Sequence, residues 1–342
     1  MNRTNRTNRM NRFRPSPFAS FASLGLLASL AMATTGLTPA SAFAEFVFWT
    51  NNGGDFLWHN PANWSPAHVP TAGDDAFNLA GGEIDIVNGG NVNSIQSNGF
   101  IKLSGSGTFN LNADSYFNGG LSMFNLGGTI FLENKGVLEI GTSFTYFSGW
   151  IHQTGLGAMV LKPNCVTTVK TGAPHYLRGG SFTNQGPMTL EPNATIVLGN
   201  FNQGDPFTSL INEVSGQLNL GANASFTDWS SGPTQGGYSS IDNRGNMKAT
   251  GGTSVIEKDI AFSLTSTGAL FLDGATLDVQ SFGNVFGGQL GFGTYLLVGG
   301  SQLVTHVGAI TSIANGVTVA LPIPQHRWRG CTRSRRTTDT SA

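Results

Sequence analysis

The 342-residue sequence is poor in cysteine and in charged residues. Cys165 and Cys331 are its two cysteines, too few for the disulfide framework of a small secreted domain. We therefore expect both thiols to be free or structurally neutral. Charged residues make up only 11% of the chain. Few segments have the Ala, Leu, Glu and Lys content that favours α-helices, so a helical fold is not expected.

Basic residues are especially scarce in the central part of the chain. Residues 45–321 contain eight Lys and Arg against eighteen Asp and Glu, a difference of 8 − 18 = −10. Binding to nucleic acid needs clustered basic side chains, so nucleic acid is excluded as a partner. The remaining arginines lie in the first 14 residues and after Pro324.

The chain also lacks a long uninterrupted apolar run. Five arginines and no acid occupy the first 14 residues, and a mostly apolar stretch follows that Ser and Thr residues dilute. The segment ends in Ala42-Phe43-Ala44, with small residues at the spacing that signal peptidases recognise. We predict a signal peptide over residues 1–44, cleaved before Glu45, and no stable transmembrane span in the mature chain.

Glycine and asparagine, by contrast, are abundant, with 47 and 30 residues. Both tolerate the left-handed backbone angles of tight turns. They recur in one phrase, an Asn followed closely by Gly and then by alternating apolar and polar residues. The clearest copies are Asn98-Gly-Phe-Ile-Lys-Leu, Asn134-Lys-Gly-Val-Leu-Glu-Ile, Asn184-Gln-Gly-Pro-Met-Thr-Leu and Asn243-Arg-Gly-Asn-Met-Lys-Ala, with looser copies at Asn212 and Thr267.

A turn followed by a short alternating strand, repeated along a chain, indicates stacked β-coils. The phrases are 36, 50, 28, 31 and 24 residues apart, and the 50 is interpreted as two units of 25. We predict an all-β fold, a right-handed single-stranded parallel β-helix (solenoid) over residues 81–321, with ~24 residues in each of ~10 coils. Asn residues at the same turn of successive coils are expected to form side-chain ladders.

Two further segments flank the predicted solenoid. Residues 45–80 hold three tryptophans, Trp49, Trp58 and Trp64, among Asn, Gly and Pro. We expect them to form an N-terminal cap, because an open coil would expose its end strand and its apolar interior. Residues 322–342 are rich in arginine without a strand pattern and are predicted to be a disordered basic tail.

The tryptophan block carries a resemblance to a known group of proteins. Trp49 … Trp58 … Asn63-Trp64-Ser-Pro … Val69-Pro70 … Gly73-Asp74-Asp75 resembles the opening of large bacterial secreted proteins that continue into autotransporter-like or adhesin-like β-helices. The likeness covers residues 46–321. It implies a protein that is secreted or displayed on the bacterial cell surface. Members of the group often end in a Pro-Glu-Pro sorting signal, and its absence after Leu321 favours release.

Candidate catalytic chemistry is sparse. Asp74-Asp75 is a possible calcium ligand pair, but a capping turn before the first strand explains it better. Parallel β-helices also serve as polysaccharide lyases and hydrolases, which need converging carboxylates. Asp242-Asn-Arg244 and Glu257-Lys-Asp259 come nearest to such a cluster and are interpreted as solvated turns. We assign no catalytic residue, no metal ligand and no cofactor.

Aromatic side chains are the candidate ligand contacts. Four of them are predicted to stack on sugar rings along the flank of the solenoid, or alternatively to pack under a loop: Trp150, Tyr176, Trp229 and Tyr238. We expect a non-catalytic structural or adhesin-like protein that contacts polysaccharide or cell-surface material. The alternatives are a polysaccharide-degrading enzyme on the same scaffold and a β-sandwich binding module.

Overall fold

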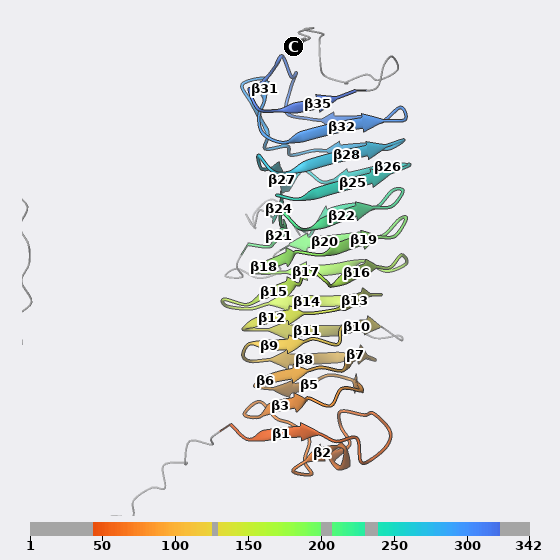
Figure 1. Ribbon diagram of the computed structural model, residues 1–342, viewed down its shortest axis with the longest axis vertical. Helices are drawn as coiled ribbons and strands as arrows, with labels where there is room; N and C mark the ends of the chain where they lie inside the picture. The colour runs from red at the N-terminus through yellow and green to blue at the C-terminus, as the bar shows by residue number, and fades with distance from the viewer. Residues whose placement is uncertain (1–43, 125–128, 200–206, 230–238, 322–342) are drawn as a thin grey trace, which may run out of the picture. The chain divides into compact units, whose positions relative to one another are not determined.

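The computed structural model describes residues 44–124, 129–199, 207–229 and 239–321. The predicted signal peptide, up to residue 43, and the predicted basic tail over residues 322–342 lie outside these residues. The described chain is all-β, and one short 3₁₀ helix, η1 (Pro61–Asn63), interrupts the strands. From β3 to β29 its strands pass in turn through three long sheets, A, B and C, so neighbours within a sheet are three strands apart in the sequence. The predicted parallel β-helix of about ten coils is confirmed (Figure 1).

Sheet A contains eleven strands and includes the N-terminal end of the fold. In spatial order they are β2 (Trp64–Ser65), β1 (Phe46–Trp49), β3 (Asp75–Asn78), β6 (Ser94–Ser97), β9 (Ser115–Phe117), β12 (Val137–Ile140), β15 (Ala158–Leu161), β18 (Ser181–Asn184), β21 (Ser209–Asn212), β24 (Ser239–Asn243) and β27 (Ile260–Leu264). All neighbours run parallel except β1 and β2, which are antiparallel.

Sheets B and C form the other two sides of each coil. Sheet B contains β4 (Glu83–Val87), β7 (Phe100–Ser104), β10 (Leu121–Phe124), β13 (Ser143–Tyr146), β16 (Val166–Val169), β19 (Pro187–Leu190), β22 (Gln217–Leu220), β25 (Asn246–Thr250), β28 (Ala269–Asp273), β32 (Thr294–Val298) and β35 (Thr318–Ala320). Sheet C contains β5 (Gly90–Val92), β8 (Gly107–Leu111), β11 (Ile130–Asn134), β14 (Gly149–Gln153), β17 (His175–Arg178), β20 (Thr195–Gly199), β23 (Ser225–Asp228), β26 (Thr253–Ile256), β29 (Thr276–Val279) and β33 (Gln302–Thr305).

A fourth, small sheet lies near the C-terminal end of the described chain. It joins β30 (Val285–Phe286), β31 (Gln289–Leu290) and β34 (Ser312–Ile313). The apolar side chains of Phe286 and Ile313 are mostly exposed there.

The interior is built from apolar columns in which each side chain lies on its equivalent one coil away. In sheet B one column runs through Ile84, Ile101, Leu121 and Phe144, none more than 3% exposed. Alternation places these residues inside because successive strand side chains point to opposite faces. Each such burial contributes about 1.5–3 kcal/mol, so the stack of columns is the main stabilising element of the fold.

The coil length matches the predicted value on average but varies along the chain. Ten register steps connect Ile84 to Val319, a mean of (319 − 84)/10 = 23.5 residues. The shortest step, from Ile84 to Ile101, is 17 residues, and the longest, from Met188 to Leu218, is 30. The extra length falls between sheets C and A, where residues 200–208 connect β20 to β21 and residues 229–238 connect β23 to β24.

The Asn and Gly of the repeated phrase occupy the corner between sheets A and B at Asn184, Asn212 and Asn243. The Asn184 amide donates to Asn212 at 2.8 Å, and the Asn212 amide donates to Asn243 at 2.6 Å. The predicted ladder is therefore present, and all three side chains are buried. Asn134 belongs instead to the end of β11 in sheet C, so its phrase marks a different corner.

The glycine of the phrase is required by close contact between coils. A Cβ on Gly216 would lie 2.5 Å from the carbonyl oxygen of Asn184, and one on Gly245 would lie 2.1 Å from that of Glu213. Neither glycine has a positive φ. Their role is therefore steric, whereas 22 other glycines of the described residues adopt the positive φ of tight turns.

The three tryptophans of residues 45–80 pack together at the N-terminal end of the coil. Trp58 is fully buried, and its ring meets those of Trp64 and Phe109 edge-on at 4.8 and 5.4 Å. The Trp64 indole donates to the Trp58 carbonyl at 2.8 Å. Trp58 and the adjacent Leu57 also pair with Asp85 of β4, the first strand of sheet B. The aromatic cluster thus covers the first coil.

Candidate functional site

Three of the predicted aromatic residues come together on the outer face of sheet C. Trp150 of β14 and Tyr176 of β17 are register partners on adjacent coils. Their rings are stacked with centroids 3.9 Å apart and an interplanar angle of 5°. Successive side chains of a strand point to opposite faces of the sheet. Ile151 and Leu177, the residues that follow the two aromatic residues, are buried, so the two rings point outward. Parallel register alone therefore brings residues 26 positions apart into direct contact.

Trp229, directly after β23, lies against this pair. Its ring meets Tyr176 edge-on at 5.3 Å and Trp150 edge-on at 5.7 Å. Val197, an outward residue of β20 that is only 7% exposed, lines the same hollow as Trp229. Trp229 itself remains 37% exposed and therefore presents aromatic surface to solvent.

Gly199 makes the approach of Trp229 possible. A Cβ at residue 199 would lie 3.1 Å from the Cβ of Trp229 and 3.2 Å from its backbone nitrogen. Such contacts are tighter than ordinary van der Waals packing. A larger residue at this position would therefore push Trp229 away from the stack.

The aromatic surface is shallow and has a polar border. Trp150, Tyr176, Val197, Trp229 and Arg178 line a hollow with about 190 Å³ of empty volume. Because this volume includes space open to solvent, the hollow suits contact with an extended surface ligand better than engulfment.

The polar border is a second outward column beside the rings. Glu133, His152 and Arg178 are register partners on β11, β14 and β17, each two residues after an aromatic residue of the first column. The His152 Nδ1 lies 3.6 Å from a Glu133 carboxylate oxygen. Hydrogen-bonding and charged groups therefore stand directly alongside the rings.

The structure thus groups Trp150, Tyr176 and Trp229, which neither the sugar-stacking nor the loop-packing interpretation specified, while Tyr238 lies outside the described residues. Sequence reasoning missed Phe131, which extends the stack with its ring 5.8 Å from Trp150, and it missed Arg178. The sequence does carry a signal for Arg178. Trp150 and His152 are two residues apart, as are Tyr176 and Arg178, and residues at this spacing lie on the same face of a strand.

The acidic groups considered for catalysis are engaged in ion pairs and backbone contacts. Arg244 donates to Asp242 at 2.8 Å and to Glu213 of the preceding coil at 3.0 Å. The bond to Asp242 is the main reason that the pKa of Arg244 is raised. Glu257 accepts the backbone N–H of Asp228 at 2.9 Å. Lys258 and Asp259 form a turn, in agreement with the interpretation of that segment. Asp242 and Asn243 instead end strand β24 and the Asn243 side chain is buried, so the interpretation as a solvated turn is wrong for Asp242-Asn-Arg244.

Asp74 and Asp75 do not converge on one site. Asp75 accepts from Asn93 and Ser94 of the next coil at 2.8 and 2.6 Å. Asp74 instead accepts both the backbone N–H and the hydroxyl of Thr71, at 2.7 and 2.8 Å. This is the geometry of a capped turn, as expected for the pair.

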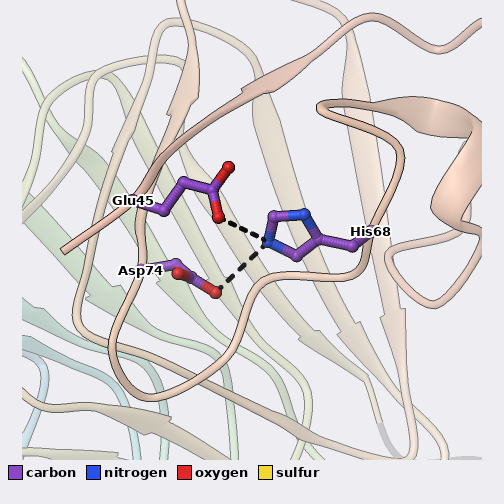
Figure 2. A group of neighbouring side chains, drawn as sticks. All are labelled: Glu45, His68 and Asp74. Atoms are coloured by element: carbon purple, nitrogen blue, oxygen red, sulfur yellow. Dashed lines mark ion pairs between the residues drawn. The ribbon is translucent and has the colours of Figure 1, made fainter. Parts of the chain in front are cut away.

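A different group of possible metal ligands surrounds Asp74. His68 Nε2 lies 3.5 Å from Asp74 Oδ2 and 3.9 Å from Glu45 Oε2, and the three side chains point toward one another (Figure 2). Burial, the largest influence, acts to raise the pKa of Asp74, but the Thr71 hydrogen bonds and His68 together hold it below its ordinary value. Sequence reasoning missed this group because the three residues have no regular spacing.

Comparisons with protein-family models, with curated proteins and with solved structures give no match to the chain. The resemblance of the tryptophan block therefore stays a prediction. Within the described residues, no helix has the length and apolar character needed to span a lipid bilayer.

Proposed function

We propose that this chain is an exported, non-catalytic β-helix protein that binds polysaccharide through the aromatic surface formed by Trp150, Tyr176 and Trp229. The supporting observation is the grouping of these three rings on the outside of sheet C. Sugar rings present faces of C–H groups that pack on aromatic rings, while their hydroxyls bond to polar neighbours. Trp and Tyr suit such a mixed surface because each combines a large apolar body with a polar atom.

Neutral polysaccharide is the favoured ligand class. The region 45–321 carries ten more acidic than basic residues, which opposes the approach of a polyanion. Several of its basic groups are also neutralised within the fold, as in the pairs of Lys102 with Asp85 at 2.8 Å and of Lys170 with Glu191 at 2.6 Å. A ligand that binds by ring stacking and hydrogen bonds meets no such electrostatic barrier.

Affinity electrophoresis of the full chain in gels containing neutral or acidic polysaccharides tests the proposal. We expect retardation by at least one neutral glycan and a loss of affinity of about tenfold or more in Trp229→Ala and Tyr176→Ala, corresponding to about 1.4 kcal/mol per tenfold. Phe286→Ala is the matched control, because Phe286 is an aromatic residue that is 63% exposed but lies outside the cluster.

Two results would overturn the proposal. One is binding that Trp229→Ala, Tyr176→Ala and Phe286→Ala leave equally unchanged. The other is release of reducing or unsaturated sugar products that a single carboxylate substitution abolishes, which would establish the degrading enzyme instead.

A further inference from the structure

Glu45, His68 and Asp74 lie around β1, β2 and β3, at the N-terminal end of the described chain and away from the aromatic surface. The side chains come from two segments: Glu45 precedes β1, whereas His68 and Asp74 both belong to the loop between β2 and β3. One ligand atom from each lies within 4.8 Å of the other two. Figure 2 shows the imidazole between the two carboxylates.

The distances are close to those of a coordinated metal. Two ligands bound at ~2.0–2.1 Å to a tetrahedral ion are separated by roughly 3.4 Å. His68 Nε2 and Asp74 Oδ2 already have a separation of 3.5 Å. Glu45 is 3.9 Å from His68, and its side chain is 54% exposed, so a small rotation of a solvent-facing carboxylate completes the set.

The three ligands differ in exposure, since the Glu45 side chain is far more exposed than that of Asp74. A metal ion would therefore bind first to His68 and Asp74, which already lie close together, and then to Glu45. The Asp74 side chain is 11% exposed, and both hydrogen bonds from Thr71 hold its carboxylate in place. Oriented carboxylates of this kind are typical of built metal sites. The Glu45 segment is also fixed at its backbone, because its carbonyl accepts the N–H of Asp75 at 2.8 Å.

We infer that Glu45, His68 and Asp74 form a binding site for a divalent transition-metal ion of the Zn²⁺ class. One imidazole nitrogen with two carboxylates matches the ligand preference of such ions, whereas Ca²⁺ and Mg²⁺ prefer all-oxygen sets. The two carboxylates offset the charge of the ion, and water completes its coordination. The ion joins the segment before β1 to the loop before β3, so it fastens the first strands of sheet A.

Isothermal titration of the metal-free full chain with ZnCl₂, paired with thermal unfolding, tests the site. We expect one Zn²⁺ to bind per chain, with an affinity at least tenfold lower in His68→Ala and in Glu45→Gln. Zn²⁺ should raise the unfolding temperature of the parent chain, and EDTA should reverse the increase. Ca²⁺ at the same concentration should have no comparable effect.

His306→Ala is the matched control. His306 Nε2 lies 2.8 Å from Asp278 Oδ1, which gives a histidine–carboxylate pair without a third ligand among the described residues. Its loss should leave Zn²⁺ binding unchanged. Because Glu45 is exposed, Glu45→Gln is expected to fold even where His68→Ala does not.

The inference fails if Glu45→Gln and the parent chain bind Zn²⁺ equally, or if the parent chain binds none. The latter result would mean that His68 forms only an ion pair with its two neighbours. Both results are independent of polysaccharide binding, so neither bears on the proposed function.

Discussion

At the residue scale, His175 is the most unusual group of the interior. It is fully buried at the start of β17, its ring contacts Tyr146 edge-on at 4.6 Å, and its Nδ1 lies 3.1 Å from the carbonyl oxygen of Thr195. Burial lowers the pKa of His175, and hydrogen bonds to backbone carbonyls offset part of that effect. The core therefore holds a histidine that resists protonation.

This burial predicts an acid-dependent loss of stability. Below pH ~6.5 the unfolded chain gains a proton on His175 that the folded chain takes up less readily, so the free energy of unfolding falls as the pH decreases. We expect the unfolding temperature to fall less between pH 7.5 and pH 5 in His175→Leu than in the parent chain. Differential scanning calorimetry measures the difference, with exposed His59→Leu as control. If the unfolding temperature falls equally in the parent chain and in His175→Leu, His175 is not the source of the acid-dependent loss of stability.

At the element scale, the Asn ladder fixes one corner of successive coils. Asn212 accepts from Asn184, and its amide donates both to the Asn243 side chain and to the backbone carbonyl of Asn246 at 3.0 Å. A polar group buried at a corner must find its partners within the protein. The repetition of Asn supplies those partners from the neighbouring coil.

Replacement of Asn212 by leucine should therefore destabilise the fold strongly. It removes the amide that satisfies Asn243 and the oxygen that satisfies Asn184, and each buried polar group left unpaired costs about 1–3 kcal/mol. Asn219→Leu is the control, because Asn219 faces outward on β22, and we expect it to change stability by less than about 0.5 kcal/mol. Urea unfolding midpoints compare the two variants. Equal midpoints would show that the ladder contributes nothing.

The elements themselves were largely predictable from sequence, since their signals are local. Alternation places Phe109 and Leu111 on the inner face of β8, and the mean coil length follows from the spacing of the Asn-Gly phrases. The exact coil lengths were not predictable, because the connections β20–β21 and β23–β24 are long without changing the register of the strands that they join. Asn134 and Asn184 belong to the same repeated sequence phrase but lie at different corners of the coil, which the sequence does not reveal.

At the scale of the whole described chain, both candidate sites depend on contacts between distant segments. The aromatic residues were identifiable as outward-facing, but their grouping requires the register of β14, β17 and β20. The ligands around His68 were not identifiable, because a loop rather than a repeat brings them to Glu45. Local pattern thus predicts the scaffold, whereas the sites arise from register and loop closure.

Sheet A also has a protected end. Its terminal strand β2 is only two residues long and pairs with β1 antiparallel, so it is a poor template for another parallel strand. Short edge strands are one means by which natural sheets avoid edge-to-edge aggregation. Trp49 and Trp64 bury this end further, with ring centroids 4.9 Å apart.

The central claim is that parallel, in-register coils build the outward columns, including the one that carries Trp150 and Tyr176. Double electron–electron resonance measures it directly, with spin labels on the outer face of sheet B at residues 102 and 248, or at 145 and 248, in a Cys165→Ala, Cys331→Ser background. The register separates these pairs by six coils and by four. At ~4.8 Å per coil the account predicts distances of roughly 29 and 19 Å. Distances that do not differ by about two coil spacings would contradict it.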